Sequence, residues 1–453
     1  MLVKINVENF KSFDEMTELT MISSNKIQQK CEHKIKIKST SILKYGVVYG
    51  ANASGKTNLI EFFRFLKASV AGGLPLESAN LFCKNREMNK EKESTFEVQI
   101  TIGDKFYAYG FSAVLNQRRI TAEWLYELFQ NGSAKCLFER GENGKTKLGD
   151  TLTLNASERN RFSVYAEDFA VSGSDAKLFL TEMNRGKKYD EDSKMMFFKD
   201  VYDWIVNHII IITPNSPLID LEYYYEDKSL SVINQLIQTF DTGINEVKIE
   251  EITLEELSSA MPKPIFESVM QHIKDKLSEK AASDLHMTMR SHENFFNIEV
   301  NGHDEPKVTT IKLHHDKSFY DFGFDEESDG TRRIFELMDM LLNNKDDMIY
   351  VVDELERSLH PKLTEHFLNL FMQIHASRKM QLLFTTHESS IMEQSLFRRD
   401  EIWFIERNAA NCSNIYSLDI FKERYDKILS KAYLEGRYGA IPVFSSFEFR
   451  KEE

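Results

Sequence analysis

The sequence predicts an α/β fold with a mainly parallel sheet, and two patterns support this class. An apolar strand at 42–49 runs into the loop GANASGKTN, and helix-spaced apolar residues follow at 58–71 until Gly72-Gly73 supplies a stop signal. From Ser328 onward the pattern becomes helix, strand, helix, strand. Because such alternation is typical of parallel strands joined by helices, this end of the chain is predicted to be α/β.

The composition limits the class of protein further. The chain has 453 residues, 42% of them hydrophobic, which predicts a globular protein of two or three domains. No apolar run approaches the roughly 18 to 20 residues of a membrane span, and the amino end lacks the apolar core of a signal peptide. The cysteines are far apart and form no CxxC pair, which argues against a zinc site and favours a cytoplasmic location; they are Cys31, Cys83, Cys136 and Cys412.

The charge balance disfavours a general nucleic-acid binder. There are 57 Lys and Arg against 71 Asp and Glu, which gives a net charge of −14. Two short basic stretches, at 84–92 and 185–188, lie among acidic residues. They are predicted to be solvated loops, with a nucleic-acid surface as the alternative.

The remaining elements follow from periodicity. Alternation predicts strands at 2–7, 96–102, 106–111, 295–300 and 309–313, and a hairpin near Asn131-Gly132. The region 190–290 is expected to be helix-rich, with helices at 254–257 and 265–280 separated by MPKP. This region is interpreted either as an inserted arm or as an ordinary helical subdomain.

The first chemical motif is a complete phosphate-loop pattern, Gly50-x-x-x-x-Gly55-Lys56-Thr57. Its glycines allow backbone N–H groups to point at phosphate oxygens, and the following helix adds positive potential. Lys56 is expected to reach the β- and γ-phosphates, and the Thr57 hydroxyl to take one Mg²⁺ position. The predicted nucleotide-binding residues of this loop are Gly50, Asn52, Ser54, Gly55, Lys56, Thr57 and Asn58.

The second motif is an apolar strand that ends in two carboxylates, MIYVVDE at 348–354. Ligands of open α/β sheets bind at this end of a strand. Asp353 is predicted to hold Mg²⁺ through water, and Glu354 to act as the general base that orients the attacking water. A later strand, LLFTT at 382–386, ends in His387, which is predicted to contact the γ-phosphate.

A second loop, EESDGTRR at 326–333, opens a helix at 334–342. Ser328, Gly330 and Thr331 at a helix start form a second anion-binding end. One phosphate group does not need two such loops from one subunit, so this loop is expected to serve a nucleotide held by another copy. The alternative interpretation of Ser328 is a plain helix N-cap.

In this order, the motifs resemble those of the ATP-binding-cassette (ABC) superfamily, in its soluble SMC-like branch. GANASGKT is similar to the Walker A motif, SDGT to the signature loop, VVDE to Walker B, SLHP to the D-loop and TTHES to the switch-histidine region. The opening INVENFKSF also resembles the first strand of that branch. The resemblance implies a P-loop NTPase, an ABC-type two-lobed ATPase head with a helical insertion, that uses ATP and Mg²⁺.

The resemblance also implies domain boundaries. An amino-terminal ATPase lobe is expected at 1–185, a helical insertion or arm at 186–290, and a carboxyl-terminal lobe with the signature, Walker B, D-loop and switch histidine at 291–453. The signature departs from the leucine-serine-glycine-glycine of transporters. The Q-loop contact has two candidates, Gln99 and a residue near Ser172-Gly173-Ser174.

Two tail segments, LFRRDEIWF at 396–404 and YLEGRYGAIP at 433–442, resemble bacterial ATPases of the RloA/AbiL type, which are related to the OLD, PARIS and Septu ATPases. This implies an ATP-hydrolysing sensor or regulator in anti-phage abortive infection. It would form ATP-sandwiched head-to-tail homodimers, or oligomers of them, and control a separately encoded nuclease-like or toxin effector. A nucleic-acid or phage-derived trigger fits this role, and no membrane partner is expected. The alternative is a RecF- or SMC-like DNA-repair ATPase that binds DNA.

Overall fold

The computed structural model describes residues 1–141, 144–172, 175–214, 227–278, 285–290, 295–300, 305–421 and 428–442. The chain divides into two compact units. The first contains 1–214, 345–356 and 375–453, and the second contains 215–344 and 357–374. The segment that carries the carboxylate motif therefore belongs to the first unit, together with the phosphate loop.

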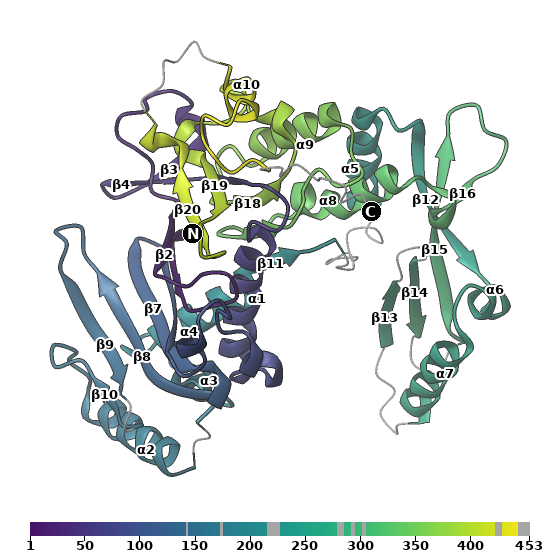
Figure 1. Cartoon of the computed structure of the whole chain (residues 1–453). Helices are drawn as coiled ribbons and strands as arrows, with labels where there is room; N and C mark the ends of the chain where they lie inside the picture. The colour runs from purple at the N-terminus through teal and green to yellow at the C-terminus, as the bar shows by residue number, and fades with distance from the viewer. Residues whose placement is uncertain are drawn as a thin grey trace, which may run out of the picture. The chain divides into compact units, whose positions relative to one another are not determined.

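A largely parallel sheet positions the predicted site in the first unit (Figure 1). Its strands pair in the order β11 (Ile209–Ile212), β17 (Ile349–Val352), β18 (Gln381–Thr386), β5 (Tyr45–Tyr49), β19 (Ile402–Arg407) and β20 (Ser413–Ser417). Neighbours from β11 to β19 are parallel, and β20 is antiparallel to β19. Every residue of β5, β17 and β18 is buried, as expected for strands whose two faces are both covered.

The helix α1 (Lys56–Gly72) follows the phosphate loop and packs near β11 and β17. It extends the predicted helix by two residues at its start and one at its end. Its buried side chains include Leu59, Phe62, Phe63 and Leu66, which recur at the three- and four-residue spacing of one helix face. These side chains join the hydrophobic core of the first unit and fix the helix start beside the sheet.

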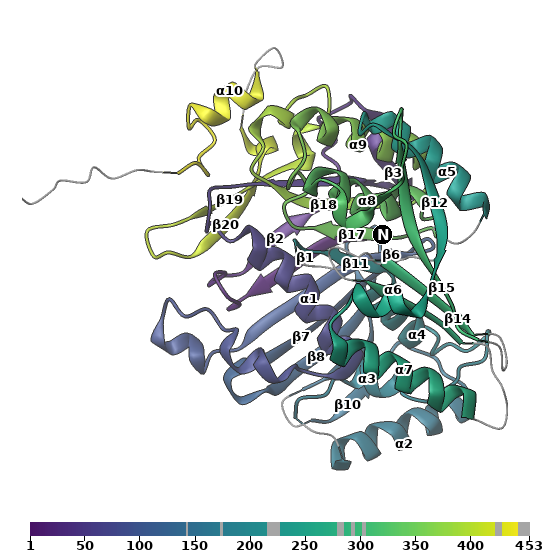
Figure 2. The same ribbon diagram turned by 90° about the vertical axis from the view of Figure 1, so that its right-hand side faces the viewer.

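An antiparallel sheet completes the first unit, in the order β10 (Thr146–Leu148), β9 (Ala134–Arg140), β8 (Arg119–Leu128), β7 (Lys105–Val114), β6 (Ser94–Ile102), β1 (Leu2–Glu8) and β2 (Thr17–Thr20). The expected hairpin joins β8 and β9. The helices α3 (Phe179–Asn184) and α4 (Phe197–Asp203) pack on β9 through Phe138, which meets Phe179 edge to face and stacks on Phe198. The helix α2 (Ala156–Ser172) contacts α3 and lies beside β10 (Figure 2). A small hairpin, β3 (Lys34–Ile37) and β4 (Thr40–Leu43), and the helix α10 (Leu429–Leu434) also belong to this unit.

The second unit combines an antiparallel sheet with helices. Its strands pair in the order β12 (Ile244–Ile252), β15 (Lys307–His315), β14 (Phe295–Val300) and β13 (Leu285–Arg290), and β16 (Phe322–Gly323) pairs with β15. Its helices are α5 (Asp227–Ile237), α6 (Leu254–Ser259), α7 (Lys263–Ser278), α8 (Asp329–Leu342) and α9 (Pro361–Ile374). A separate apolar cluster from α6, α7, β14 and β15 forms one core of this unit.

The expectation of a helix-rich region at 190–290 is met by α5, α6 and α7 but misses β12 and β13. The pairing of β12 with β15 shifts register between Ile244 and Glu246. This irregularity places an extra residue in the strand, so its apolar residues do not alternate cleanly in the sequence. None of the helices in the described ranges combines the length and the apolar character that crossing a bilayer requires.

Candidate nucleotide-binding site

A polar pocket of about 300 Å³ lies at the carboxyl edge of the parallel sheet, within the first unit. The phosphate loop, the residue after the carboxylate strand and the residue after β18 all contribute to it. The lining residues are Asn52, Ala53, Gly55, Lys56, Thr57, Asn58, Glu354, His387 and Arg407. Residues predicted from three separate motifs thus surround one cavity.

The two glycines of the loop are required by its geometry. Gly55 has a φ of +117°, and a Cβ there would lie 2.2 Å from the Ser413 hydroxyl. A Cβ on Gly50 would lie 2.4 Å from the carbonyl oxygen of Ile405. Both contacts are closer than any side chain tolerates, so larger residues would displace the loop. Because the glycines have no Cβ, the loop can turn tightly, and the N-terminus of α1 opens onto the pocket.

Lys56 is buried beneath the loop that it follows. Its Nζ donates to the carbonyl oxygens of Gly50 at 2.7 Å and Ala51 at 3.0 Å, and lies 3.3 Å from His387 Nδ1. Burial lowers the pKa of the Lys56 ammonium to about 8, although the carboxylates of Asp353 and Glu354 act in the opposite direction. The pocket therefore holds a cation that has few competing solvent contacts.

Asp353 is the central acceptor of the site. Its carboxylate accepts hydrogen bonds from the Thr57 hydroxyl at 2.9 Å and from the Thr385 hydroxyl at 2.6 Å. Asp353 is 3% exposed and Thr385 is fully buried. The Asp353 side chain, just after β17, thereby links α1 through Thr57 to β18 through Thr385.

Glu354 has a φ of 49°, in the left-handed region that residues with a side chain seldom adopt. Its backbone N–H donates to the Thr385 hydroxyl at 2.9 Å, which helps to hold this conformation. Its Oε1 lies 3.7 Å from His387 Nε2, and the His387 N–H donates to Glu356 Oε1 at 2.6 Å. The strained backbone turns the Glu354 side chain into the pocket rather than into the sheet.

The donor atoms fit a magnesium ion. The Thr57 hydroxyl and the Asp353 carboxylate offer neighbouring hard oxygen atoms, which Mg²⁺ prefers, and Mg²⁺ usually keeps several of its waters. A cluster of three or more His, Cys, Asp or Glu side chains arranged for a metal is absent from the described ranges. The site thus suits an ion bound together with substrate phosphates rather than an ion in a cage made by the protein alone.

The second predicted loop lies in the second unit. Ser328 caps α8, because its Oγ accepts the Thr331 N–H at 3.1 Å, and the two hydroxyls lie 2.9 Å apart. A Cβ on Gly330 would lie 2.8 Å from the Ser358 carbonyl oxygen, so the signature and D-loop segments are in close contact. The N-cap interpretation of Ser328 is therefore observed, and it is compatible with anion binding at the same helix end.

Several supporting residues were not predicted. Ser413 donates to the Ser54 carbonyl oxygen at 2.5 Å, and its hydroxyl oxygen lies within hydrogen-bond distance of the Ser12 hydroxyl, at 2.7 Å. Ser12 also accepts from the Asn58 side chain at 2.7 Å. These serines come from segments about 400 residues apart, and no local pattern marks them. Arg407 is the last residue of β19 and lines the pocket; a basic residue at the end of an apolar strand is a sequence pattern that could have predicted this position.

The first Q-loop candidate lies away from the pocket lining, and most of the second falls outside the described residues. Gln99 lies on β6 and donates to Glu97 at 3.1 Å, and it is not among the lining residues. Gly173 and Ser174 of the other candidate lie outside the described residues.

Three of the seven cations in the two basic stretches pair with acidic neighbours. Arg86 pairs with Asp14 at 2.9 Å and Lys92 with Glu8 at 2.8 Å. In the second stretch, Lys187 is bonded to Glu182. A paired cation attracts a phosphate backbone more weakly than a free one, so these three residues add little to a nucleic-acid surface.

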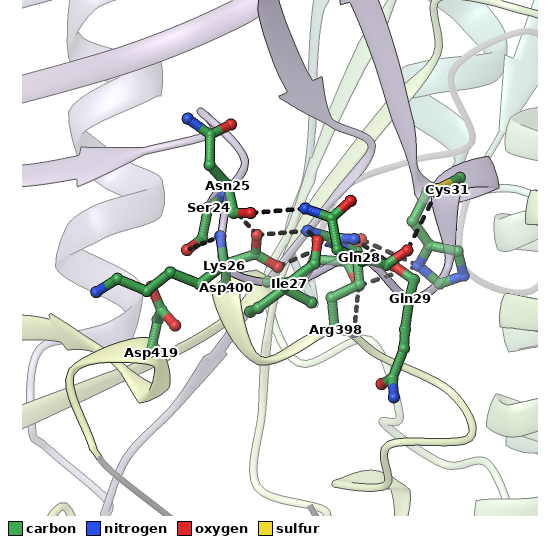
Figure 3. A network of polar contacts seen from close by, with 12 residues as sticks. Ser24, Asn25, Lys26, Ile27, Gln28, Gln29, Cys31, Arg398, Asp400 and Asp419 are labelled. Atoms are coloured by element: carbon green, nitrogen blue, oxygen red, sulfur yellow. Dashed lines mark hydrogen bonds and ion pairs between the residues drawn. The ribbon is translucent and has the colours of Figure 1, made fainter.

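The tail motif at 396–404 forms a buried clamp outside the pocket (Figure 3). Arg398 makes a bidentate contact with Asp400, at 2.9 and 2.7 Å, and also donates to the carbonyl oxygens of Ile27 and Gln29. Asp400 in turn accepts the Ser24 N–H at 2.7 Å. The motif therefore fastens the 24–29 loop to the start of β19.

The fold and the pocket define a P-loop NTPase fold: a phosphate loop between a parallel strand and a helix, with an acidic strand end beside it. The family model described as "AAA domain, putative AbiEii toxin, Type IV TA system" matches residues 47–147 and 195–393. These ranges cover more than half of the chain, so the chain belongs to that family.

The other comparisons add limited information. No curated protein matches the chain. Among solved structures, an SMC head bound to the C-winged helix domain of ScpA has a TM-score of 0.36 at 10% identity, over 92% of this chain and 97% of that chain. The SMC head domain from Thermotoga maritima has a TM-score of 0.34 at 12% identity, over 92% and 98%. A third, an Smc head with an extended coiled coil bound to the C-terminal domain of ScpA derived from Pyrococcus furiosus, has a TM-score of 0.36 at 11% identity, over 92% and 96%.

Proposed function

We propose that the chain binds and hydrolyses ATP in the pocket between the phosphate loop and the carboxylate strand. One observation carries this proposal: Thr57 is hydrogen-bonded to Asp353, while Lys56, His387 and Glu354 line the same cavity. Phosphoryl transfer depends on positioning and charge stabilisation, and this set supplies both.

Each side chain has a role that follows from its place. Lys56 exchanges its loop carbonyl contacts for the β- and γ-phosphate oxygens. Glu354 accepts a proton from the attacking water, or orients that water. His387, which lies between Lys56 and Glu354, contacts the γ-phosphate and orders these two groups. Thr57 and Asp353 would hold Mg²⁺, whose charge offsets the negative charge on the phosphate oxygens.

Two copies of the chain are proposed to complete each site. Ser328, Gly330 and Thr331 present a helix N-terminus in the second unit, and the pocket in the first unit already has its own at α1. In a symmetric head-to-tail dimer, each copy supplies its phosphate loop to one ATP and its signature loop to the other. ATP then favours the associated state, and hydrolysis releases it.

Replacement of Glu354 by Gln tests the hydrolysis step. The amide keeps the shape but cannot accept the proton, so the ATPase rate is expected to fall by roughly 10²-fold or more while ATP still binds. Glu365→Gln, at a half-buried position of α9 outside the pocket lining, is the matched control and should keep the wild-type rate. An unchanged rate for Glu354→Gln contradicts the proposed base.

Mixing two inactive variants tests the shared sites. Lys56→Ala disables the phosphate loop, and Ser328→Arg blocks the signature helix end. A mixed dimer retains one intact pair of surfaces, so mixing is expected to restore up to about half of the activity per dimer. A tagged pull-down confirms that mixed dimers form, and their formation without any restored activity contradicts the shared site.

We further propose that the ATPase regulates a separate toxin or nuclease-like effector in anti-phage defence, in the manner of the RloA/AbiL ATPases. The family description, which names a toxin and a toxin–antitoxin system, supports this context. The test is growth and phage survival in cells that carry the chain and its neighbouring gene, with wild-type chain or Glu354→Gln. Protection that is equal with and without the chain contradicts the proposed role.

The DNA-repair alternative receives less support, because the chain has a net charge of −14 and three of the seven candidate basic residues are paired with carboxylates. It predicts ATP-dependent binding of duplex or gapped DNA whose affinity falls steeply with salt. Fluorescence anisotropy with labelled DNA from 50 to 200 mM salt, a range taken from typical DNA-binding proteins, distinguishes the two roles.

A further inference from the structure

The carboxyl ends of four neighbouring parallel strands meet at the pocket, and three of them carry the residues of the proposed ATP site. Glu354 follows β17, His387 follows β18, and the phosphate loop follows β5. Arg407 ends β19, the neighbour of β5 on the side away from β18. The pocket thus has an acidic end at Glu354, and Arg407 lies at the opposite end, beyond the phosphate loop.

The contacts of the loop set the direction in which a nucleotide would lie. Thr57 reaches toward Asp353, and Lys56 toward His387, so the terminal phosphate belongs on the β17 and β18 side. This step rests on the proposed ATP site. A nucleotide whose phosphates follow the loop then directs its sugar and base toward β19.

The position of Arg407 relative to the loop is fixed. The Ile405 carbonyl lies directly against Gly50, and Ser413, which pairs with Arg407 across the β19–β20 hairpin, bonds to the Ser54 carbonyl. Ser413 N–H also donates to the Ser12 carbonyl oxygen at 2.7 Å. The backbone of Arg407 is therefore held in place by the sheet and the phosphate loop, rather than lying in a free loop.

The Arg407 side chain itself is exposed, and within the described ranges its guanidinium makes no hydrogen bond or ion pair. Of the lining side chains, the ones with a broad delocalised face are His387, at the acidic end, and Arg407. A guanidinium is planar and weakly hydrated, and it stacks well on aromatic faces. We propose that Arg407 binds the nucleoside end of the nucleotide by stacking its guanidinium on the base.

The experiment measures dissociation constants for ATP, GTP and inorganic tripolyphosphate by titration calorimetry, with the full chain. Three variants separate shape from charge: Arg407→Gln lacks both, Arg407→Lys keeps the charge, and Arg407→Trp keeps a flat face. Arg64→Gln, on the exposed side of α1 and outside the pocket, controls for the loss of one surface cation.

Stacking predicts that Arg407→Gln and Arg407→Lys weaken ATP and GTP by about ten- to a hundredfold, while Arg407→Trp stays within a few-fold of wild type. Tripolyphosphate affinity should change by less than about threefold, since it has no base to stack. If Arg407→Lys binds ATP like wild type and Arg407→Gln weakens tripolyphosphate as much as ATP, Arg407 contacts a phosphate and the stacking proposal is overturned. Wild-type ATP affinity in Arg407→Gln also overturns it.

The same titrations distinguish this inference from the proposed site. A wild-type chain that binds neither ATP nor tripolyphosphate removes the nucleotide site altogether. A wild-type chain that binds both, with variants that are indistinguishable from it, removes only the role of Arg407.

Discussion

Thr385 joins the ends of β17 and β18 at the pocket, and its hydroxyl is the most informative single group to remove. It donates to Asp353 Oδ1 at 2.6 Å and accepts the Glu354 N–H at 2.9 Å, in a fully buried position. Thr385→Val keeps the shape of the side chain but leaves a carboxylate oxygen and a backbone N–H without this partner. Each buried polar group that loses its partner costs about 1–3 kcal/mol, so with two such groups the free energy of unfolding is expected to fall by about 2–6 kcal/mol.

Thr385→Ser is the matched control. It keeps the hydroxyl and loses a buried methyl group, at a cost of about 1 kcal/mol. The serine variant is therefore predicted to be more stable than the valine variant, although valine buries more apolar surface. A view in which packing alone decides stability predicts the opposite order.

Urea unfolding followed by tryptophan fluorescence measures this difference. All three tryptophans, Trp124, Trp204 and Trp403, belong to the first unit, so the signal reports the unit that contains Thr385. The valine variant is also expected to lose at least about tenfold in ATPase rate, because Glu354 no longer has a fixed backbone. Equal stability of the two variants, or a valine variant with the wild-type rate, would refute the reasoning.

Three further predictions concern other parts of the first unit. Gly55→Ala should weaken ATP binding by more than tenfold, because its Cβ would collide with Ser413, whereas Gly72→Ala, which meets open space, should change affinity little; titration calorimetry on both variants checks this. Burial lowers the pKa of Lys44 to about 8 in the folded chain, below its ordinary value, so the unfolded chain holds the proton more tightly between pH 8 and about 10.5. The cost of the buried ammonium is present below pH 8 and disappears as pH rises through this window. The free energy of unfolding of the wild type should therefore rise by about 2 kcal/mol relative to that of Lys44→Met. A difference between the two that stays constant from pH 7 to 10 contradicts this assignment. Arg398→Met should lower the free energy of unfolding by about 3–5 kcal/mol, because it leaves Asp400 buried without its cation. The double variant Arg398→Met with Asp400→Leu should recover part of this loss. A double variant that loses more stability than the two single variants lose together would refute the pairing.

The sequence was sufficient to predict the parts of the site that are local. The strand before Gly50, the loop and the start of α1 follow one another in the chain, and their spacing is dictated by phosphate geometry. The strand at 349–352 was likewise predicted from its apolar run and the two carboxylates after it. In both cases neighbouring residues carry the chemistry, so a pattern in the sequence reveals it.

The supporting contacts could not be predicted because they join distant segments. Ser12 and Ser413 are ordinary serines in the sequence, and they become supports of the loop only when β19 and β20 lie beside β5. The hydroxyl of Thr385 bridges Asp353 and Glu354 across two strands, a contact that periodicity does not encode. The strand β12 was missed for a different reason, since its bulge disrupts the alternation on which strand prediction depends.

The path of the chain through its two units has a consequence for synthesis and for fragments. The segment 345–356 lies in the first unit but is flanked on both sides by segments of the second, and β18 and β19 follow later still. The phosphate loop therefore leaves the ribosome some three hundred residues before the strands that complete its sheet, and such distant pairings form slowly. A continuous piece of the gene cannot encode the nucleotide-binding unit alone; a minimal version would need short linkers to replace the second unit at two separate places.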